Sequence, residues 1–139
     1  MKKLLLILLC LPMIGFGQNV NIPDVNFKAY LVGNSLINTN GDTEIQLSEA
    51  NAFNGGINCS NLNISDLNGI EAFTSINALY CLNNQLTSLD LTQNTLLTVL
   101  QCQSNQLTSL DVNGPDSLNV LFCYENQLIS LDVSQNTAL

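Results

Sequence analysis

The residues best suited to chemistry in this chain form one short polar segment, residues 38–49, which reads NTNGDTEIQLSE. Side-chain oxygens stand at its first, third, fifth and twelfth places, and a backbone carbonyl is available at its seventh. This is the spacing at which an EF-hand loop holds calcium, a cation that prefers oxygen ligands. The sequence therefore predicts a candidate calcium site, whose ligands are Asn38, Asn40, Asp42, Glu44 (through its carbonyl) and Glu49.

Two features of this segment favour an alternative without the ion. Asn38 is neutral at the place where EF-hands carry Asp, and fewer ligand charges weaken calcium binding. Thr43 stands at the sixth place, where EF-hands require a Gly for a sharp turn. The favoured alternative is a polar turn that keeps the EF-hand shape. Calcium is the only cofactor that the sequence suggests.

Catalysis finds little support in the composition. The chain has no His, and its Lys and Arg residues total three, so a Ser or Cys nucleophile lacks a base to activate it. A pair of carboxylates is able to cleave glycosides, but each acid here is accounted for by a turn, a helix cap or a repeat. We therefore expect a protein that is not an enzyme, with a glycoside hydrolase as the least favoured alternative.

Three nearly identical blocks of equal length occupy the second half of the chain, at 76–96, 97–117 and 118–138. Each carries the pattern Leu-x-Cys-x-x-Asn-x-Leu-x-x-Leu-Asp-(Leu/Val). A unit this short cannot bury its own apolar residues, so each block predicts one coil of a solenoid that is stabilised by stacking on its neighbours. Residues 57–75 form a variant first coil, which gives four coils in total.

Each slot of the repeat predicts a local role. Leu-x-Cys should form a short parallel strand with both side chains pointing inward. The Asn should bond backbone groups of its own and adjacent coils, as a ladder. The Asp should accept backbone N–H groups in its turn rather than share a cation with the Asp above it. These slots hold Asn84, Asn105 and Asn126, and Asp90, Asp111 and Asp132.

Strand positions on either side of the Leu and Cys slots should point outward onto a concave face. Exposed aromatic side chains there suit a protein or glycan partner. The alternative is that these residues only pack on one another along the ladder. The outward set is Ala78, Val99 and Val120 together with the predicted partner-binding residues Tyr80, Leu82, Gln101, Gln103, Phe122 and Tyr124.

Residues 1–17 have the features of a bacterial signal peptide. A positive start at Lys2 and Lys3 precedes an apolar run over 4–14, and small residues precede a predicted cleavage site before Gln18. The run is too short to span a bilayer as a stable helix, so we expect no transmembrane segment after cleavage. The alternative, acylation of Cys10 as in a lipoprotein, is less favoured. The sequence therefore predicts a secreted or cell-surface protein.

The mature chain is strongly acidic. It keeps one basic residue, Lys28, against eleven acids, a net charge of −10 (1 − 11). Because phosphate binding needs basic donors, nucleic acid and anionic membrane surfaces are excluded as expected partners.

Four cysteines remain after cleavage, all in one slot of the repeat: Cys59, Cys81, Cys102 and Cys123. An even count in a secreted protein suggests disulfides. Side chains on parallel strands about 4.8 Å apart, however, point alongside one another, which suits a disulfide poorly. We expect free, buried thiols and no metal site there, because no CxxC motif or His accompanies them.

Residues 18–56 should form a helical cap over the first coil. One helix is expected to start at 21–24, to carry Phe27, Tyr30 and Leu31 on one face and to end at 33–34. A second, at 48–53, should be capped by Ser48 and stopped by the glycines at 55–56. A solenoid needs such a cap to shield its first coil from water. No sequence that would cap the last coil follows it, so we expect a fragment of a longer protein.

The repeat pattern resembles the bacterial leucine-rich repeat of the short, 21-residue type. The start at Ile22, Pro23 and Asp24 and the irregular first repeat at 62–71 resemble the cap of internalin-like proteins. The resemblance implies an α/β-type solenoid, a right-handed coil of mostly short parallel strands and turns, with a small, helical, EF-hand-like N-terminal cap. Internalin repeats are usually longer by one position, as only the first repeat is here. No particular receptor follows from it.

These observations divide the chain into a signal peptide (1–17), a cap (18–56) and a four-coil solenoid (57–139). The resemblance implies a module that mediates protein–protein binding, or glycan binding, through its concave strand face. The alternative is a structural spacer within a longer surface protein. The sequence names no partner and no oligomeric state.

Overall fold

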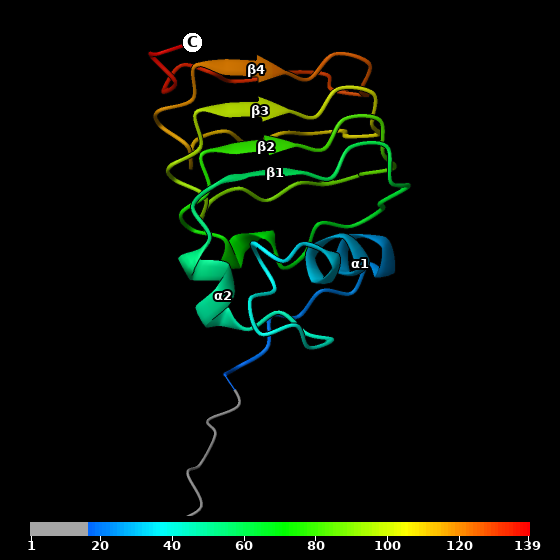
Figure 1. The fold of residues 1–139 in the computed structure, drawn as a ribbon. Helices are drawn as coiled ribbons and strands as arrows, with labels where there is room; N and C mark the ends of the chain where they lie inside the picture. Colours follow the sequence, from blue (N-terminus) through cyan, green and yellow to red (C-terminus); the bar gives the residue numbers. More distant parts are fainter. Residues whose placement is uncertain (1–16) are drawn as a thin grey trace, which may run out of the picture.

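The computed structural model describes residues 17–139, so the predicted signal peptide lies, except for Gly17, outside the described residues. Four short parallel strands form one sheet in the order β1-β2-β3-β4. In Figure 1 they stack like rungs, with two helices below β1 and the C-terminus at the far end. The elements are α1 (Val25–Gly33), α2 (Leu47–Ala52), β1 (Gly56–Asn58), a 3-10 helix η1 (Ile70–Ala72), β2 (Ala78–Tyr80), β3 (Val99–Gln101) and β4 (Val120–Phe122).

The strand register follows the sequence repeat. Leu79 pairs with Leu100, and Leu100 pairs with Leu121, so each partner lies one block further along the chain. Ile57 pairs with Leu79 at a step that is longer by one position, as expected for the irregular first coil. The predicted leucine-rich-repeat solenoid is therefore confirmed, with few helices and one turn of chain per rung.

A single apolar core runs through the stack. Ile57, Leu79 and Leu100 are completely buried, whereas Leu121 in the last coil is only partly buried. Each coil covers the core side chains of the one before it, and within residues 17–139 the last coil has a neighbour on one side only. Burying one such side chain contributes about 1.5–3 kcal/mol, so the stack is stabilised coil by coil.

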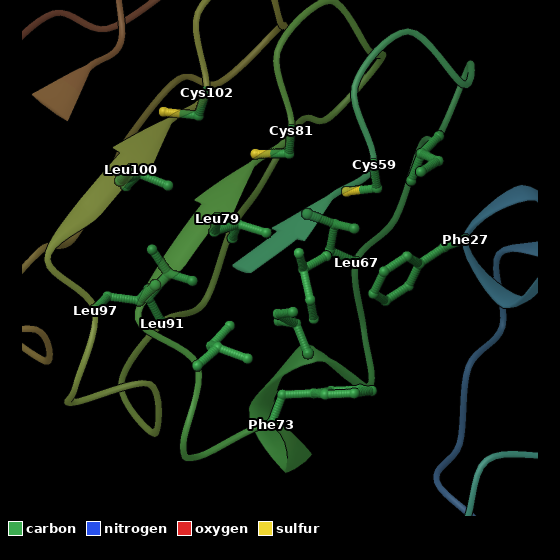
Figure 2. Packing of buried hydrophobic residues seen from close by; sticks show 14 of the residues in the cluster. Phe27, Cys59, Leu67, Phe73, Leu79, Cys81, Leu91, Leu97, Leu100 and Cys102 are labelled. Carbon is green, nitrogen blue, oxygen red and sulfur yellow. The ribbon is translucent and has the colours of Figure 1, made fainter. Parts of the chain in front are cut away.

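The four cysteines form the predicted column of free thiols. Figure 2 shows the first three in a row along the stack, with their sulfur atoms on the same side. No disulfide joins any of the four, and three are fully buried while Cys123 is partly exposed. Burial raises the pKa of Cys59 and Cys102 to about 12. Their slot therefore acts as a small apolar core position rather than a reactive one.

The predicted asparagine ladder joins adjacent coils. The Asn105 amide donates to the carbonyls of Cys81 and Cys102, both at 3.0 Å, and its oxygen accepts the N–H of Leu86 at 3.0 Å. Asn84 and Asn126 make the equivalent bonds one coil down and one coil up. Each Asn thus satisfies buried backbone groups of two coils at once.

The cap helices pack against the first coil largely as predicted. Phe27 and Leu31 on α1 are fully buried, and Asp24 caps this helix through the N–H groups of Asn26 and Phe27. The other carboxylate oxygen of Asp24 accepts the N–H and hydroxyl of Ser65 at 2.8 and 2.9 Å, which ties the helix to the solenoid.

The predicted start of the second helix was wrong. α2 begins at Leu47, and its N-cap is Gln46 rather than Ser48. The Gln46 N–H donates to the carboxylate of Glu49 at 3.0 Å, and that bond places the start of the helix closer to the N-terminus than predicted. The helix ends at Ala52, one position before the expected end.

Among residues 17–139, no helix is both long and apolar enough to cross a membrane.

Candidate functional site

The concave strand face comprises the outward side chains of β2, β3 and β4 and of the residue two places after each strand. Its exposed part lies on the last coil. Phe122 and Tyr124 are 45% and 60% exposed, and their ring centroids lie 6.5 Å apart at 50°. Aromatic rings with this much exposed surface are an available contact area for a partner.

The other predicted binding residues have a smaller exposed fraction than Phe122 and Tyr124. Tyr80, Leu82 and Gln101 are half-buried. They continue the surface from the aromatic pair toward the first coil, since Tyr80 pairs with Gln101 and Gln101 with Phe122 across the sheet. The structure therefore brings the sequence-predicted residues onto one face of three consecutive rungs.

The prediction that Gln103 and Ala78 are exposed was wrong. Gln103 is 6% exposed and Ala78 is 8% exposed. Gln103 lies between Leu82 on the previous coil and Tyr124 on the next. The Gln103 carbonyl accepts the N–H of Asn83, and the N–H of Ser104 donates to the Tyr124 carbonyl. This slot has a neighbouring coil on each side, whereas the same slot of the last coil, which holds Tyr124, is 60% exposed. The Gln103 amide oxygen is buried with no hydrogen-bond partner in the described part of the chain.

The concave strand face carries no charge. Its outward positions hold only Gly, Ala, Val, Asn, Ser, Leu, Gln, Tyr and Phe from Gly56 to Tyr124. Glu125 follows Tyr124 in the chain and accepts the hydroxyl of Ser104 at 2.6 Å. The face itself therefore presents aromatic rings and amides without a charged side chain.

The aspartates of the repeat are explained by their turns. The Oδ1 atoms of Asp90, Asp111 and Asp132 accept the N–H groups two positions further on, at 2.8–2.9 Å. The bonds from Thr92 lower the pKa of Asp90. Two of these aspartates line a hollow of about 370 Å³ with Asp66 and Glu71. The local hydrogen bonds are those predicted for this slot, and no shared cation is needed to explain them.

The candidate calcium ligands are occupied by the protein's own donors. One oxygen of Glu49 accepts both the N–H and the hydroxyl of Thr39 and the N–H of Asn40, at 2.8–3.2 Å. The other accepts the N–H of Gln46. Burial alone would raise the pKa of Glu49, but these hydrogen bonds hold it below its usual value. The side chain that would bind calcium through both oxygens is thus fully hydrogen-bonded.

The other loop residues show the same arrangement. The two oxygens of Asp42 accept the N–H of Glu44 and the amides of Asn40 and Gln46. Asn38 accepts the N–H of Gly41, and the Glu44 side chain pairs with Lys28 at 2.6 Å. As arranged, the loop fits the ion-free alternative, and calcium binding stays a prediction. In the described segment, no group of three or more His, Cys, Asp or Glu side chains is placed to hold a metal ion.

A second asparagine position, not predicted from the sequence, also joins adjacent coils. The amide of Asn94 donates to the carbonyls of Ile70 and Phe73 at 2.9 and 3.0 Å. Asn136 does the same to the coil before it. The signal was present as Asn in the same slot of the first and third blocks. Pro115 interrupts that slot in the second block and obscured the pattern.

Comparison with known proteins places these features in context. No protein-family model matches the chain. Over 84 residues, or 58% of the chain, it is 41% identical to Internalin J of Listeria monocytogenes, of which the match spans 9%. It resembles the solved functional domain of InlJ from Listeria monocytogenes at 39% identity and a TM-score of 0.77, covering 88% of this chain and 28% of that one.

A second solved structure, the internalin InlF of Listeria monocytogenes, matches at 19% identity and a TM-score of 0.70. That match covers 88% of this chain and 36% of InlF, and it supports the fold alone. The InlJ domain includes a cysteine ladder, and a column of cysteines also runs through the present solenoid. The chain spans only a minor part of each of these proteins.

Proposed function

Because this chain is an internalin-like leucine-rich-repeat protein, we propose that it binds a protein partner through its concave strand face. The observation that carries the proposal is the row that the sheet places side by side on an uncharged surface, Tyr80, Gln101 and Phe122, with the Phe122 and Tyr124 rings 6.5 Å apart. Aromatic rings and amides in one continuous row suit contact with a protein partner. Tyr80, Leu82 and Gln101 extend the contact area, while Gln103 supports it from below.

The energetics of such a face favour a small number of strong contacts. Aromatic residues at the centre of an interface are typical hot spots, and truncating one commonly costs about 2 kcal/mol or more of binding free energy. The neighbouring amide of Gln101 supplies orientation through hydrogen bonds rather than most of the affinity.

A glycan is the second candidate ligand, and one observation favours it. The face combines aromatic rings with amide side chains and lacks charge, and a sugar offers both apolar C–H surface and hydroxyl groups to such a site. A structural spacer role remains the alternative if the face meets no ligand.

We also propose that the chain acts outside the cell. Residues 1–17 have the composition of a signal peptide, and cleavage before Gln18 yields a mature protein with a net charge of −10 (1 − 11). A binding module without catalytic activity suits this location.

The test is a binding screen against arrayed extracellular proteins and a glycan array, followed by variants. The double variant Tyr80→Ala and Phe122→Ala should weaken binding of any captured ligand by on the order of 1,000-fold, since two interface aromatics are removed at about 2 kcal/mol each. The control is Leu96→Ala with Ile129→Ala, which removes side chains that are 57% and 97% exposed but lie off this face. A ligand that binds the double variant as tightly as the parent chain contradicts the proposal.

A further inference from the structure

The segment that follows the predicted signal peptide is held against the cap. The Leu47 N–H donates to the Gln18 carbonyl at 2.8 Å, and the Val20 N–H donates to the Ile45 carbonyl at 2.8 Å. Asn19 forms an antiparallel bridge with Gln46 between these two bonds. Gln18 is therefore an anchored residue, whose surroundings are defined right at the predicted cleavage point.

The α-nitrogen and the side-chain amide of Gln18, which are able to react with each other, make no hydrogen bond to the described residues. Its side chain is exposed. Within residues 17–139, neither the side-chain amide nor the backbone nitrogen has a partner, and the bonded group is the carbonyl. A five-membered ring joins the α-nitrogen of a terminal Gln to its own Cδ. Nothing in the described structure holds these two atoms apart.

We propose that Gln18 is a modification site, which closes to pyroglutamate after cleavage; the inference rests on the proposed export of the chain. The unprotonated α-nitrogen attacks Cδ of the side-chain amide. The new N–Cδ bond forms, the Cδ–Nε2 bond breaks, and Nε2 leaves as ammonia with the proton that the α-nitrogen gives up. No oxidant or co-reactant is required. The α-amino group has an ordinary pKa of about 7.7–8.0, so a useful fraction is unprotonated near neutral pH.

The folded chain has room for the product. A Cβ placed on Gly17 would lie 3.2 Å from the side chain of Gln46, so the position before Gln18 is tightly packed. Cleavage removes Gly17 and frees that space beside the new terminus. The lactam retains the Gln18 carbonyl, so the bond from Leu47 persists and the terminus stays attached to the cap.

Cyclisation has a chemical consequence that is particular to this composition. The mature chain contains a single lysine, Lys28. Loss of the α-amino group therefore leaves Lys28 Nζ, which pairs with Glu44, as the only amine in the mature protein. A terminus without an α-amine also resists aminopeptidases, which would otherwise remove the residues that pair with the cap.

The test uses the full precursor, residues 1–139, expressed in a secreting bacterial host and recovered as exported protein. We expect an intact mass that is one ammonia lighter than residues 18–139, and an amine-reactive probe should add one label per chain after denaturation. The matched control is Gln18→Ala, which should be exported, should show no loss of ammonia and should take two labels.

The outcomes separate the inference from the proposed binding function. A chain that starts at Gln18, retains its ammonia and takes two labels overturns the inference. A chain that is uncleaved, or cleaved elsewhere, also overturns it, because Gln18 then has no α-amine. Ligand binding to the same preparations tests the concave strand face independently, since that face lies on the coils and Gln18 lies on the cap.

Discussion

At the scale of single residues, stability rests on polar side chains that are buried and fully bonded. Asn105 joins two coils through its amide, and Glu49 closes the cap loop through both carboxylate oxygens. An apolar substitution at either residue leaves several backbone groups without a partner, which costs more than the lost bond alone where those groups are buried. Such residues therefore affect folding more than their small volume suggests.

Asn105→Ala should destabilise the protein by about 2–4 kcal/mol, because it orphans the Leu86 N–H and two carbonyls in the core. Chemical denaturation measures this as a lower midpoint. The control is Asn119→Ala, an exposed Asn whose side chain makes no hydrogen bond in the described structure, and its effect should stay within about 0.5 kcal/mol. Equal effects of the two substitutions would contradict the ladder as a source of stability.

Glu49 should make stability depend on pH in a defined direction. Its folded pKa lies below the ordinary value of 4.5 because hydrogen bonds to the carboxylate outweigh its burial. The stabilisation is therefore present above pH 4.5 and is lost as the pH falls through the folded value. Glu49→Gln should lower the melting temperature at pH 7 and converge with the parent chain in acid. Glu125→Gln, at an exposed position, is the control; parallel melting curves for Glu49→Gln and the parent at every pH would contradict this role.

At the scale of elements, the polar loop between α1 and α2 is closed by its own hydrogen-bond donors, which bind the oxygens predicted to hold the ion. We expect millimolar calcium to leave the melting temperature unchanged, because an ion would have to displace the bonds from Thr39, Asn40 and Gln46 to Glu49. A ligand that binds the folded state must raise stability. A rise with calcium that is absent with magnesium and lost in Glu49→Gln would establish the calcium site instead.

The cysteine column should show graded reactivity along the stack. The thiolate is the reactive form, and burial raises the pKa of Cys59 and Cys102 to about 12. Cys123 lies on the last coil and is partly exposed. In the protein that starts at Gln18, a thiol reagent at pH 8 should modify one cysteine in the folded state and four in denaturant. Cys123→Ser should abolish labelling of the folded protein and leave three labelled cysteines in denaturant. Rapid labelling of Cys81 in the folded protein would refute this order.

Prediction from sequence succeeded for the elements where one slot recurs in every block. The strands, the Asn84 ladder, the free thiols and the Asp90 turns follow from the repeat, because identical residues in stacked coils must find equivalent surroundings. Exposure was harder to predict. Whether Gln103 is covered depends on the coils on both sides of it, which no single block contains.

The contacts between cap and solenoid were also outside the reach of the sequence. Asp24 bonds Ser65 across 41 positions, and the Tyr30 hydroxyl accepts the N–H of Asn58 across 28. Such pairs have no periodicity, so only the folded arrangement reveals them. The start of α2 was missed for a local reason, since Ser48 is a favoured type of capping residue, but the bond from the Gln46 N–H to Glu49 starts the helix earlier.

At the scale of the whole molecule, the chain separates its charge from its proposed binding surface. Its net charge is −8, yet the outward strand positions from Gly56 to Tyr124 are uncharged. Acids on the other surfaces repel negatively charged partners at a distance and keep the molecule soluble. Contact through the concave strand face then depends on apolar burial and neutral hydrogen bonds.

This separation predicts that ligand binding is almost independent of salt for a neutral ligand. Interactions between exposed charges are largely screened beyond about 10 Å at 0.1 M ionic strength, so a contact that depended on charge would weaken steeply as salt rises. The affinity for a neutral ligand should change by less than about threefold between about 0.05 M and about 0.5 M salt. Tyr124→Glu, which puts a carboxylate beside Phe122, should weaken binding, whereas Tyr124→Phe should preserve it. Steep salt dependence with the parent chain would show that acids elsewhere on the molecule bind the partner, and that the uncharged face does not.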